Sequence, residues 1–209
     1  MRLGIRQGLP IGQGPRRGFT LLELIAVVTI IAVTAALAIP TAVIQLRDRR
    51  VQEAARRIGT VYREARLRAL GRGSAVLVRF TGGDITVHEA RVGVSVGGEA
   101  GCADLPVSSC LNTNWSSPAA QRVVDGYSRP TSGELSNLSV AITDSANAAV
   151  PNLDICFTPM GRGFSRRENT NGPFSPLSDA FVATVSRTGL TRTRQVVMMP
   201  NGTARLFAE

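Results

Sequence analysis

One uninterrupted apolar run lies near the N-terminus of this 209-residue chain. Residues 19–40 read FTLLELIAVVTIIAVTAALAIP, and Glu23 is the only charged residue among them. At a rise of about 1.5 Å per residue, a helix of this length spans roughly 33 Å, which is enough to cross a bilayer. We therefore expect residues 19–41 to form a transmembrane helix that can also pack among other apolar helices.

Two simpler interpretations of the run explain it less well. A secretory signal peptide has only about 7–15 apolar residues before its cleavage site. A plain signal anchor leaves Glu23 unexplained, because an intramembrane carboxylate costs on the order of 2.5–3.5 kcal/mol and normally has a partner. Arginines lie on both sides of the run, at positions 16–17 and within 47–50, so the charge bias does not fix its orientation.

The composition argues against an enzyme. All 24 basic residues are arginine, which excludes lysine Schiff-base and phosphate-loop lysine chemistry, and His88 is the single histidine. The net charge of +9 is concentrated: residues 1–18 carry four arginines and no acid, residues 47–72 carry nine arginines against three acids, and residues 73–209 are neutral. We expect no catalytic set, no cofactor and no metal site.

The residues around the start of the run carry a specific motif. The stretch 16–23 reads RRGFTLLE, with Gly18 directly before Phe19 and Glu23 fifth from Phe19. It resembles the cleavage and methylation site of type IV prepilins and type II secretion pseudopilins. The resemblance implies that prepilin peptidase removes residues 1–18 as a leader and that Phe19 becomes the N-methylated first residue.

The same resemblance supplies a partner for Glu23. In assembled pili this carboxylate is thought to pair with the N-terminal amine of the neighbouring subunit, here that of Phe19. Inside an apolar bundle the low effective dielectric strengthens this attraction, and either charge alone would be buried without compensation. We therefore expect Glu23 to act in assembly with other pilins or pseudopilins.

Beyond Pro40, where pilins usually have a helix-kinking proline, an amphipathic continuation of the helix is predicted over residues 42–72. Apolar residues recur at seven-residue spacing at Ile44, Val51, Ile58 and Ala65. This stripe is predicted to pack on the protein's own sheet, and Gly71-Arg72-Gly73 to end the helix. The nine arginines opposite either form a solvated face or contact anionic membrane lipid, nucleic acid or acidic neighbours.

From residue 74 onward the pattern changes to alternation and turns. Strands are predicted at 75–80, 84–89, 91–96, 122–124, 138–143, 153–157, 181–186, 195–199 and 204–207. The segment 160–180 is predicted to be a polar surface loop. The sequence therefore predicts an α+β fold, in which a long N-terminal helix, transmembrane in its first half, packs on an antiparallel β-sheet head of residues 73–209.

The second half of the chain is similar to GspH/FimT-type minor pilins, through Phe157-Thr158-Pro159, Gly161 and the late strand with its Pro200-Asn201-Gly202 turn. Some FimT-type members are implicated in DNA uptake through a Gly-Arg-x-Arg motif near the C-terminus. The matching stretch here, 202–205, keeps the glycine and the final Arg205 but lacks the first arginine.

Two functions follow from these resemblances. The first is a structural minor pilin or pseudopilin of a type II secretion pseudopilus or a type IV pilus. The alternative is a DNA-binding minor pilin for natural transformation, with Arg166, Arg167 and Arg205 as candidate DNA contacts. In either case we expect a single-pass inner-membrane protein with a periplasmic head. A signal-anchored periplasmic enzyme is a third interpretation, and it lacks a catalytic set.

Three cysteines fit export to an oxidising compartment. All three pairings are open from the sequence, and we expect Cys102–Cys110, because both lie in a loop, whereas Cys156 lies in an apolar strand and is expected to be a buried small residue. His88 beside Glu89 is expected to be structural, because adjacent strand residues point to opposite faces.

Overall fold

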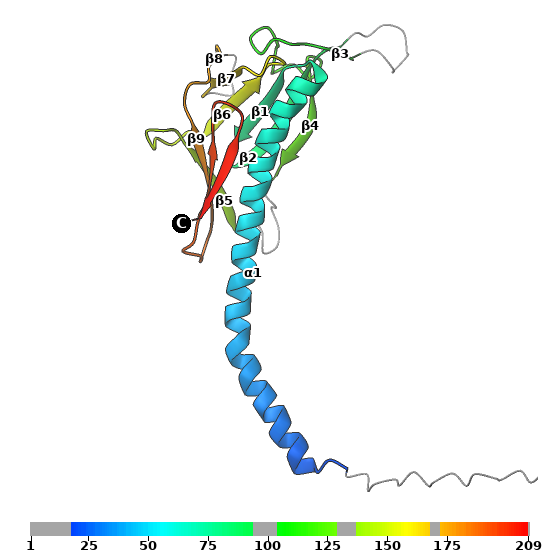
Figure 1. The fold of residues 1–209 in the computed structure, drawn as a ribbon, viewed down its shortest axis with the longest axis vertical. Helices are drawn as coiled ribbons and strands as arrows, with labels where there is room; N and C mark the ends of the chain where they lie inside the picture. The colour runs from blue at the N-terminus through cyan, green and yellow to red at the C-terminus, as the bar shows by residue number, and fades with distance from the viewer. Residues whose placement is uncertain (1–17, 94–103, 129–136, 168–171, 209) are drawn as a thin grey trace, which may run out of the picture. The chain divides into compact units, whose positions relative to one another are not determined.

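The computed structural model describes residues 18–93, 104–128, 137–167 and 172–208. The chain forms two compact units that divide between Val43 and Ile44. The single long helix α1 (Leu21–Arg72) contributes to both units (Figure 1).

The first unit contributes the N-terminal part of α1. Thr20 caps the helix, since its Oγ1 accepts a hydrogen bond from the backbone N–H of Glu23 (3.2 Å). Along this part, the hydroxyls of Thr29, Thr34 and Thr41 donate to backbone carbonyls of the preceding turn. The polar groups of these three threonines are thus satisfied within the helix itself, which suits an apolar environment.

The part of α1 in the second unit buries one face. Its buried residues are Val51, Ala54, Ala55, Ile58, Gly59, Val61, Tyr62, Ala65 and Ala69. The predicted apolar stripe is confirmed from Val51 onward, whereas Ile44, its expected first member, is exposed. Gly73 follows the helix with φ of 68°, a left-handed conformation that favours glycine, so the predicted end of the helix is also confirmed.

Two antiparallel sheets complete the second unit. The strands of the first sheet are β1 (Val76–Thr81), β2 (Asp84–Gly93), β3 (Asp104–Pro106), β4 (Gln121–Tyr127), β6 (Asn152–Phe157), β7 (Gly163–Arg166) and β8 (Ser175–Pro176). They follow the order β3-β2-β1-β6-β7-β8, and β4 also pairs with β2.

The second sheet has the order β11-β10-β9-β5. Its strands are β5 (Leu138–Thr143), β9 (Phe181–Arg187), β10 (Arg194–Met198) and β11 (Ala204–Ala208). Buried and half-buried residues alternate strictly along β9 and β10, because one face of this sheet packs on the core. The predicted α+β fold, a long N-terminal helix on antiparallel sheets, is confirmed.

Some predicted strand limits were wrong. The segments 84–89 and 91–96 were expected to be separate strands, but β2 runs continuously to Gly93, and the residues after it lie outside the described part of the chain. The segment 160–180 was expected to be a loop, yet it contains β7 and β8. Both strands are short: β7 pairs with β6 and β8, and β8 forms the edge of the first sheet.

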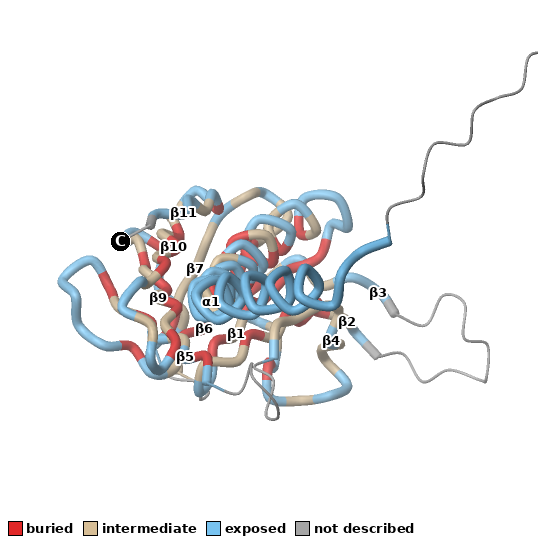
Figure 2. Tube along the Cα trace, turned by 90° about the horizontal axis from the view of Figure 1, so that it is seen from below, coloured by how far each residue is buried: buried red, intermediate tan, exposed pale blue. Residues whose placement is uncertain are grey.

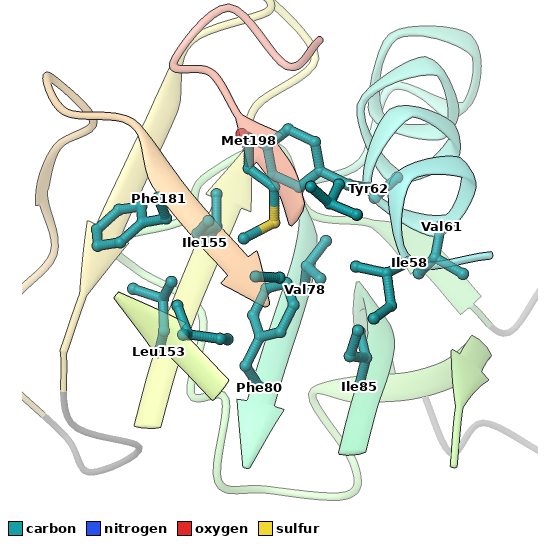
Figure 3. Packing of buried hydrophobic residues seen from close by; sticks show 14 of the residues in the cluster. Ile58, Val61, Tyr62, Val78, Phe80, Ile85, Leu153, Ile155, Phe181 and Met198 are labelled. Atoms are coloured by element: carbon teal, nitrogen blue, oxygen red, sulfur yellow. The ribbon is translucent and has the colours of Figure 1, made fainter. Parts of the chain in front are cut away.

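The main core lies between the buried face of α1 and the two sheets (Figure 3). Tyr62 from the helix packs its ring against Phe157 with 5.3 Å between centroids, and its hydroxyl donates to the backbone carbonyl of Met199 (2.8 Å). Figure 2 shows buried residues, in red, along this part of the helix and along strands of both sheets. Helix and sheets are therefore held together by one continuous apolar cluster.

A second, smaller cluster covers the opposite face of the first sheet. Trp115 is 2% exposed there, and its indole N–H donates to the carbonyl of Cys110 (3.0 Å). Cys110 forms a disulfide with Cys156 of β6, with 6.0 Å between the Cα atoms. The expected Cys102–Cys110 pair was therefore wrong, and Cys102 lies outside the described residues. Sequence proximity misled the prediction, because the loop folds back over β6.

Candidate functional site

The apolar segment of residues 19–43 is largely exposed in the described chain. Phe19 and Leu22 are each 79% exposed and Ile30 is 64% exposed. Within the described residues, α1 provides one stretch that is long and apolar enough to cross a membrane. Continuous apolar surface of this extent is unfavourable in water.

Packing among the described residues explains neither Gly18 nor Glu23. A side chain at Gly18 would meet nothing within 4 Å, so packing does not require a glycine there. The backbone N–H of Glu23 bonds to Thr20, but no described residue offers its exposed carboxylate a cationic partner. Its acidic charge in the first turn suits the helix dipole, which is the modest structural explanation for it.

The arginines of α1 are only partly a solvated face. Glu89 of β2 is 5% exposed and accepts hydrogen bonds from Arg68 Nε (3.1 Å), Arg122 Nη2 (3.1 Å) and Ser74 Oγ (3.1 Å). Burial alone would raise the pKa of Glu89, but these hydrogen bonds lower it below its usual value. The cluster ties the end of the helix to the first sheet.

Arg166 is not available to bind DNA. Its Nε donates to Asp154 Oδ2 (2.8 Å), and its guanidinium lies 4.5 Å from the ring centroid of Phe174. Arg79 binds the same carboxylate through Nε (2.9 Å), and the Asp154 side chain is fully buried. The prediction that Arg166 contacts DNA was wrong, because this arginine is itself buried and neutralises the buried carboxylate of Asp154.

The other two candidate DNA contacts belong to different parts of the fold. Arg167 follows β7 in the first sheet and pairs with Asp144 Oδ2 (2.9 Å). Arg205 lies on β11 of the second sheet and is exposed. A further arginine of this sheet, Arg194, is 9% exposed, and its Nη2 donates to both carboxylate oxygens of Asp48 (2.9 Å each). The head therefore does not bring these arginines together as one free patch.

His88 is placed as a structural residue. Its Nε2 lies 2.8 Å from Thr86 Oγ1, whereas Glu89 contacts arginines instead. Burial, reinforced by Arg79 and opposed by Asp154, lowers the pKa of His88 from 6.5 to about 4. Among the described residues, no group of three or more His, Cys, Asp or Glu could hold a metal ion.

The acids that hold these arginines could not be found from the sequence. Asp48, Glu89 and Asp154 pair with arginines 146, 21 and 75 positions away, and no local pattern marks such partners. The open edge at β11 was also missed, since its position depends on the order of strands in the sheet.

Two structures of the type IV minor pilin FimU from Pseudomonas aeruginosa are similar to this chain. The first has 14% identity, a TM-score of 0.39 and coverage of 77% of this chain and 90% of that one. The second has 15% identity, a TM-score of 0.36 and coverage of 75% and 91%. No curated protein matches the chain.

The family model of the prokaryotic N-terminal methylation motif matches residues 14–39. This stretch contains Gly18, Phe19 and Glu23 and most of the apolar segment. The chain thus carries the N-terminal methylation motif, in agreement with the type IV pilin and pseudopilin family that those residues resemble.

Proposed function

We propose that this chain is a minor pilin or pseudopilin, a structural subunit of a type IV pilus or a type II secretion pseudopilus and not an enzyme. The observation that carries the proposal is the exposed apolar segment, which has a single acid and begins inside the matched methylation motif. A folded head that leaves such a helix uncovered is suited to a subunit whose remaining contacts come from lipid first and from neighbouring subunits later.

In this proposal the N-terminus is processed at the membrane. Prepilin peptidase cuts between Gly18 and Phe19, removes residues 1–18 on the cytoplasmic side and methylates Phe19. The inner membrane holds the apolar segment until assembly, and the head lies in the periplasm. The Cys110–Cys156 disulfide supports this location, because disulfides persist in the periplasm and are rare in the cytosol.

Glu23 supplies the assembly contact. Cleavage creates a cationic amine on Phe19, and the first turn of α1 presents a carboxylate that no described residue neutralises. In an apolar bundle, pairing the amine of one subunit with Glu23 of the next removes two uncompensated charges at once. A single charged pair in apolar surroundings also specifies one register between subunits, as a polar residue does in a coiled coil.

The DNA-binding alternative receives no support from the positions of its candidate residues. Arg166 is buried on Asp154, and Arg167 is paired with Asp144. We therefore base the proposal on the structural subunit alone.

The test separates processing from assembly. Glu23→Ala, expressed from the native locus, should be cleaved like the wild type, because the bond between Gly18 and Phe19 is unchanged, and its recovery in sheared filaments should fall by about tenfold or more. Glu53→Ala is the matched control, since it also removes an exposed acid from α1, outside the apolar segment. Wild-type incorporation of the Glu23→Ala protein would contradict the proposal.

A further inference from the structure

The second sheet ends in an open strand edge. β11 pairs with β10 on one side and has no strand partner on the other within the described chain. The backbone N–H of Met199 donates to the carbonyl of Thr203 (2.9 Å), which sets the alternation of the ladder. The odd-numbered residues of β11 therefore bond to β10, while the N–H and C=O groups of Ala204 and Leu206 face away from it.

This edge lacks the usual protection against pairing. Natural edge strands are commonly shielded by several charges, a proline, a bulge or a covering element. β11 carries one charge, Arg205, and no proline, and it exposes Leu206 (39%) and Phe207 (49%). An exposed edge with apolar side chains is a template on which another strand can form main-chain hydrogen bonds.

A groove runs between this edge and the helix. Its cavity of about 330 Å³ lies between α1 and the last two strands, and its helix wall includes the small residues Ala55 and Gly59. Ala204 and Leu206 form part of the strand wall. Figure 1 shows β11 beside this part of α1, so a segment laid along β11 would also contact the helix.

The charge around the groove is positive and uncompensated. Arg56 and Arg63, seven residues apart on α1, line it together with Arg205. All three are exposed, and none has an acidic partner among the described residues; Arg63 contacts only Thr60 Oγ1 (3.4 Å). Other arginines of the head do have acids, as Arg194 has Asp48. A ligand that carries carboxylates would therefore bind this groove most tightly, because it can pair with these arginines.

We propose that the groove and the β11 edge bind an extended acidic segment of a partner protein, which adds to the second sheet as a further strand. The edge offers outward N–H donors as well as C=O acceptors, and a peptide backbone complements both, whereas nucleic-acid phosphates only accept. A second copy of β11 would bring a second set of the same arginines to the edge. The binding is independent of processing at Gly18, because every residue involved lies in the second unit.

The charge contribution is tested on the full mature chain in non-ionic detergent. The probe is a fluorescein-labelled peptide of about ten residues with alternating Glu and Val, titrated by fluorescence anisotropy at physiological ionic strength. Arg63→Gln/Arg205→Gln should weaken binding by about tenfold or more. Arg49→Gln/Arg162→Gln removes two exposed arginines outside the groove and should change binding by less than about twofold.

The backbone contribution is tested at Leu206. Leu206→Pro deletes an outward N–H that forms no bond to β10, so the sheet should remain intact while binding weakens by about tenfold or more. Leu206→Ala keeps that N–H but removes more of the side chain than Leu206→Pro does, and it should nevertheless bind the peptide more tightly than Leu206→Pro. A peptide N-methylated at alternate residues should bind poorly to the wild type, which tests strand addition without any change to the protein.

Three results would overturn the proposal. The first is undiminished binding of the N-methylated peptide, or of the acidic peptide to a folded Leu206→Pro variant. The second is tighter binding of a short DNA duplex than of the peptide, with equal losses in both arginine double variants, which would indicate a nucleic-acid surface. The third is a wild-type chain that does not bind the peptide but self-associates, with the self-association abolished by Leu206→Pro. That result would indicate that a second copy of this chain occupies the edge. None of these results affects the Glu23 test.

Discussion

The two parts of α1 are both rich in apolar residues, but only one is covered by the protein's own fold. Ile58, in the second unit, is fully buried against the sheets, whereas Ile30, in the apolar segment, is 64% exposed. The second unit closes its core with its own strands, a disulfide and buried ion pairs. The apolar segment is exposed among the described residues, and apolar surface of this extent is unfavourable in water. The buried contacts of the second unit stabilise the head, whereas the exposed apolar segment is a surface on which other molecules can pack.

The largest expected effect is a loss of stability of the head when its disulfide is removed. The Cys110–Cys156 disulfide closes a loop of 46 residues, which corresponds to about 4 kcal/mol in the chain-entropy account. Cys110→Ala/Cys156→Ala should lower the free energy of unfolding of the head by about that amount. Urea unfolding can be followed by the fluorescence of Trp115, the single tryptophan, which lies in the cluster around this disulfide.

Cys102→Ala is the control for the disulfide prediction. Because the Cys110–Cys156 bond does not include Cys102, this substitution should leave the unfolding midpoint close to that of the wild type. A loss of stability in Cys102→Ala equal to that of the double variant, or a Cys102–Cys110 peptide in a non-reduced digest, would contradict the pairing.

The next effect compares the two parts of the helix directly. Ile58→Ala creates a cavity in the main core and should destabilise the head by about 3 kcal/mol, within the range for buried isoleucine truncations. Ile30→Ala makes the same chemical change on an exposed surface and should leave the unfolding of the head unchanged. Urea unfolding of both variants in the same detergent measures this difference. Equal losses of stability would contradict the claim that only the second part of α1 packs in the core of the head.

The smallest effect concerns pH and should be confined to the head. The pKa of His88 is lowered to about 4, chiefly by burial, so the unfolded chain takes up this proton at a higher pH than the folded one. The contribution of neutral His88 to the free energy of unfolding is fully present above about pH 6.5 and is lost as the pH falls towards 4. We expect a loss of about 2 kcal/mol, below the full equivalent of the shift because His88 is not completely buried.

His88→Gln tests the origin of this pH dependence. Without the imidazole, the decline in the free energy of unfolding between pH 6.5 and about 4 should flatten relative to the wild type. Circular dichroism across that interval measures it. An unchanged slope in His88→Gln would assign the decline to other groups, such as the hydrogen-bonded carboxylate of Glu89, whose pKa is lowered.

The sequence predicted features that depend on local pattern and missed those that depend on distant partners. The motif at Gly18–Glu23 and the stripe from Val51 to Ala65 are each contained in one segment, so their residues alone define them. The cysteine pairing, the burial of Arg166 and the open edge at β11 were not predicted. Each depends on which strands lie side by side, and alternation within one strand carries no information on its neighbours.

The most direct measurement of the central claim is the mass of the N-terminal peptide of the mature protein. If the apolar segment is a processed assembly helix, the peptide begins at Phe19, lacks residues 1–18 and carries one additional methyl group on its amine. A mature chain that begins at Met1, or after a small residue near Ala38, would contradict the account.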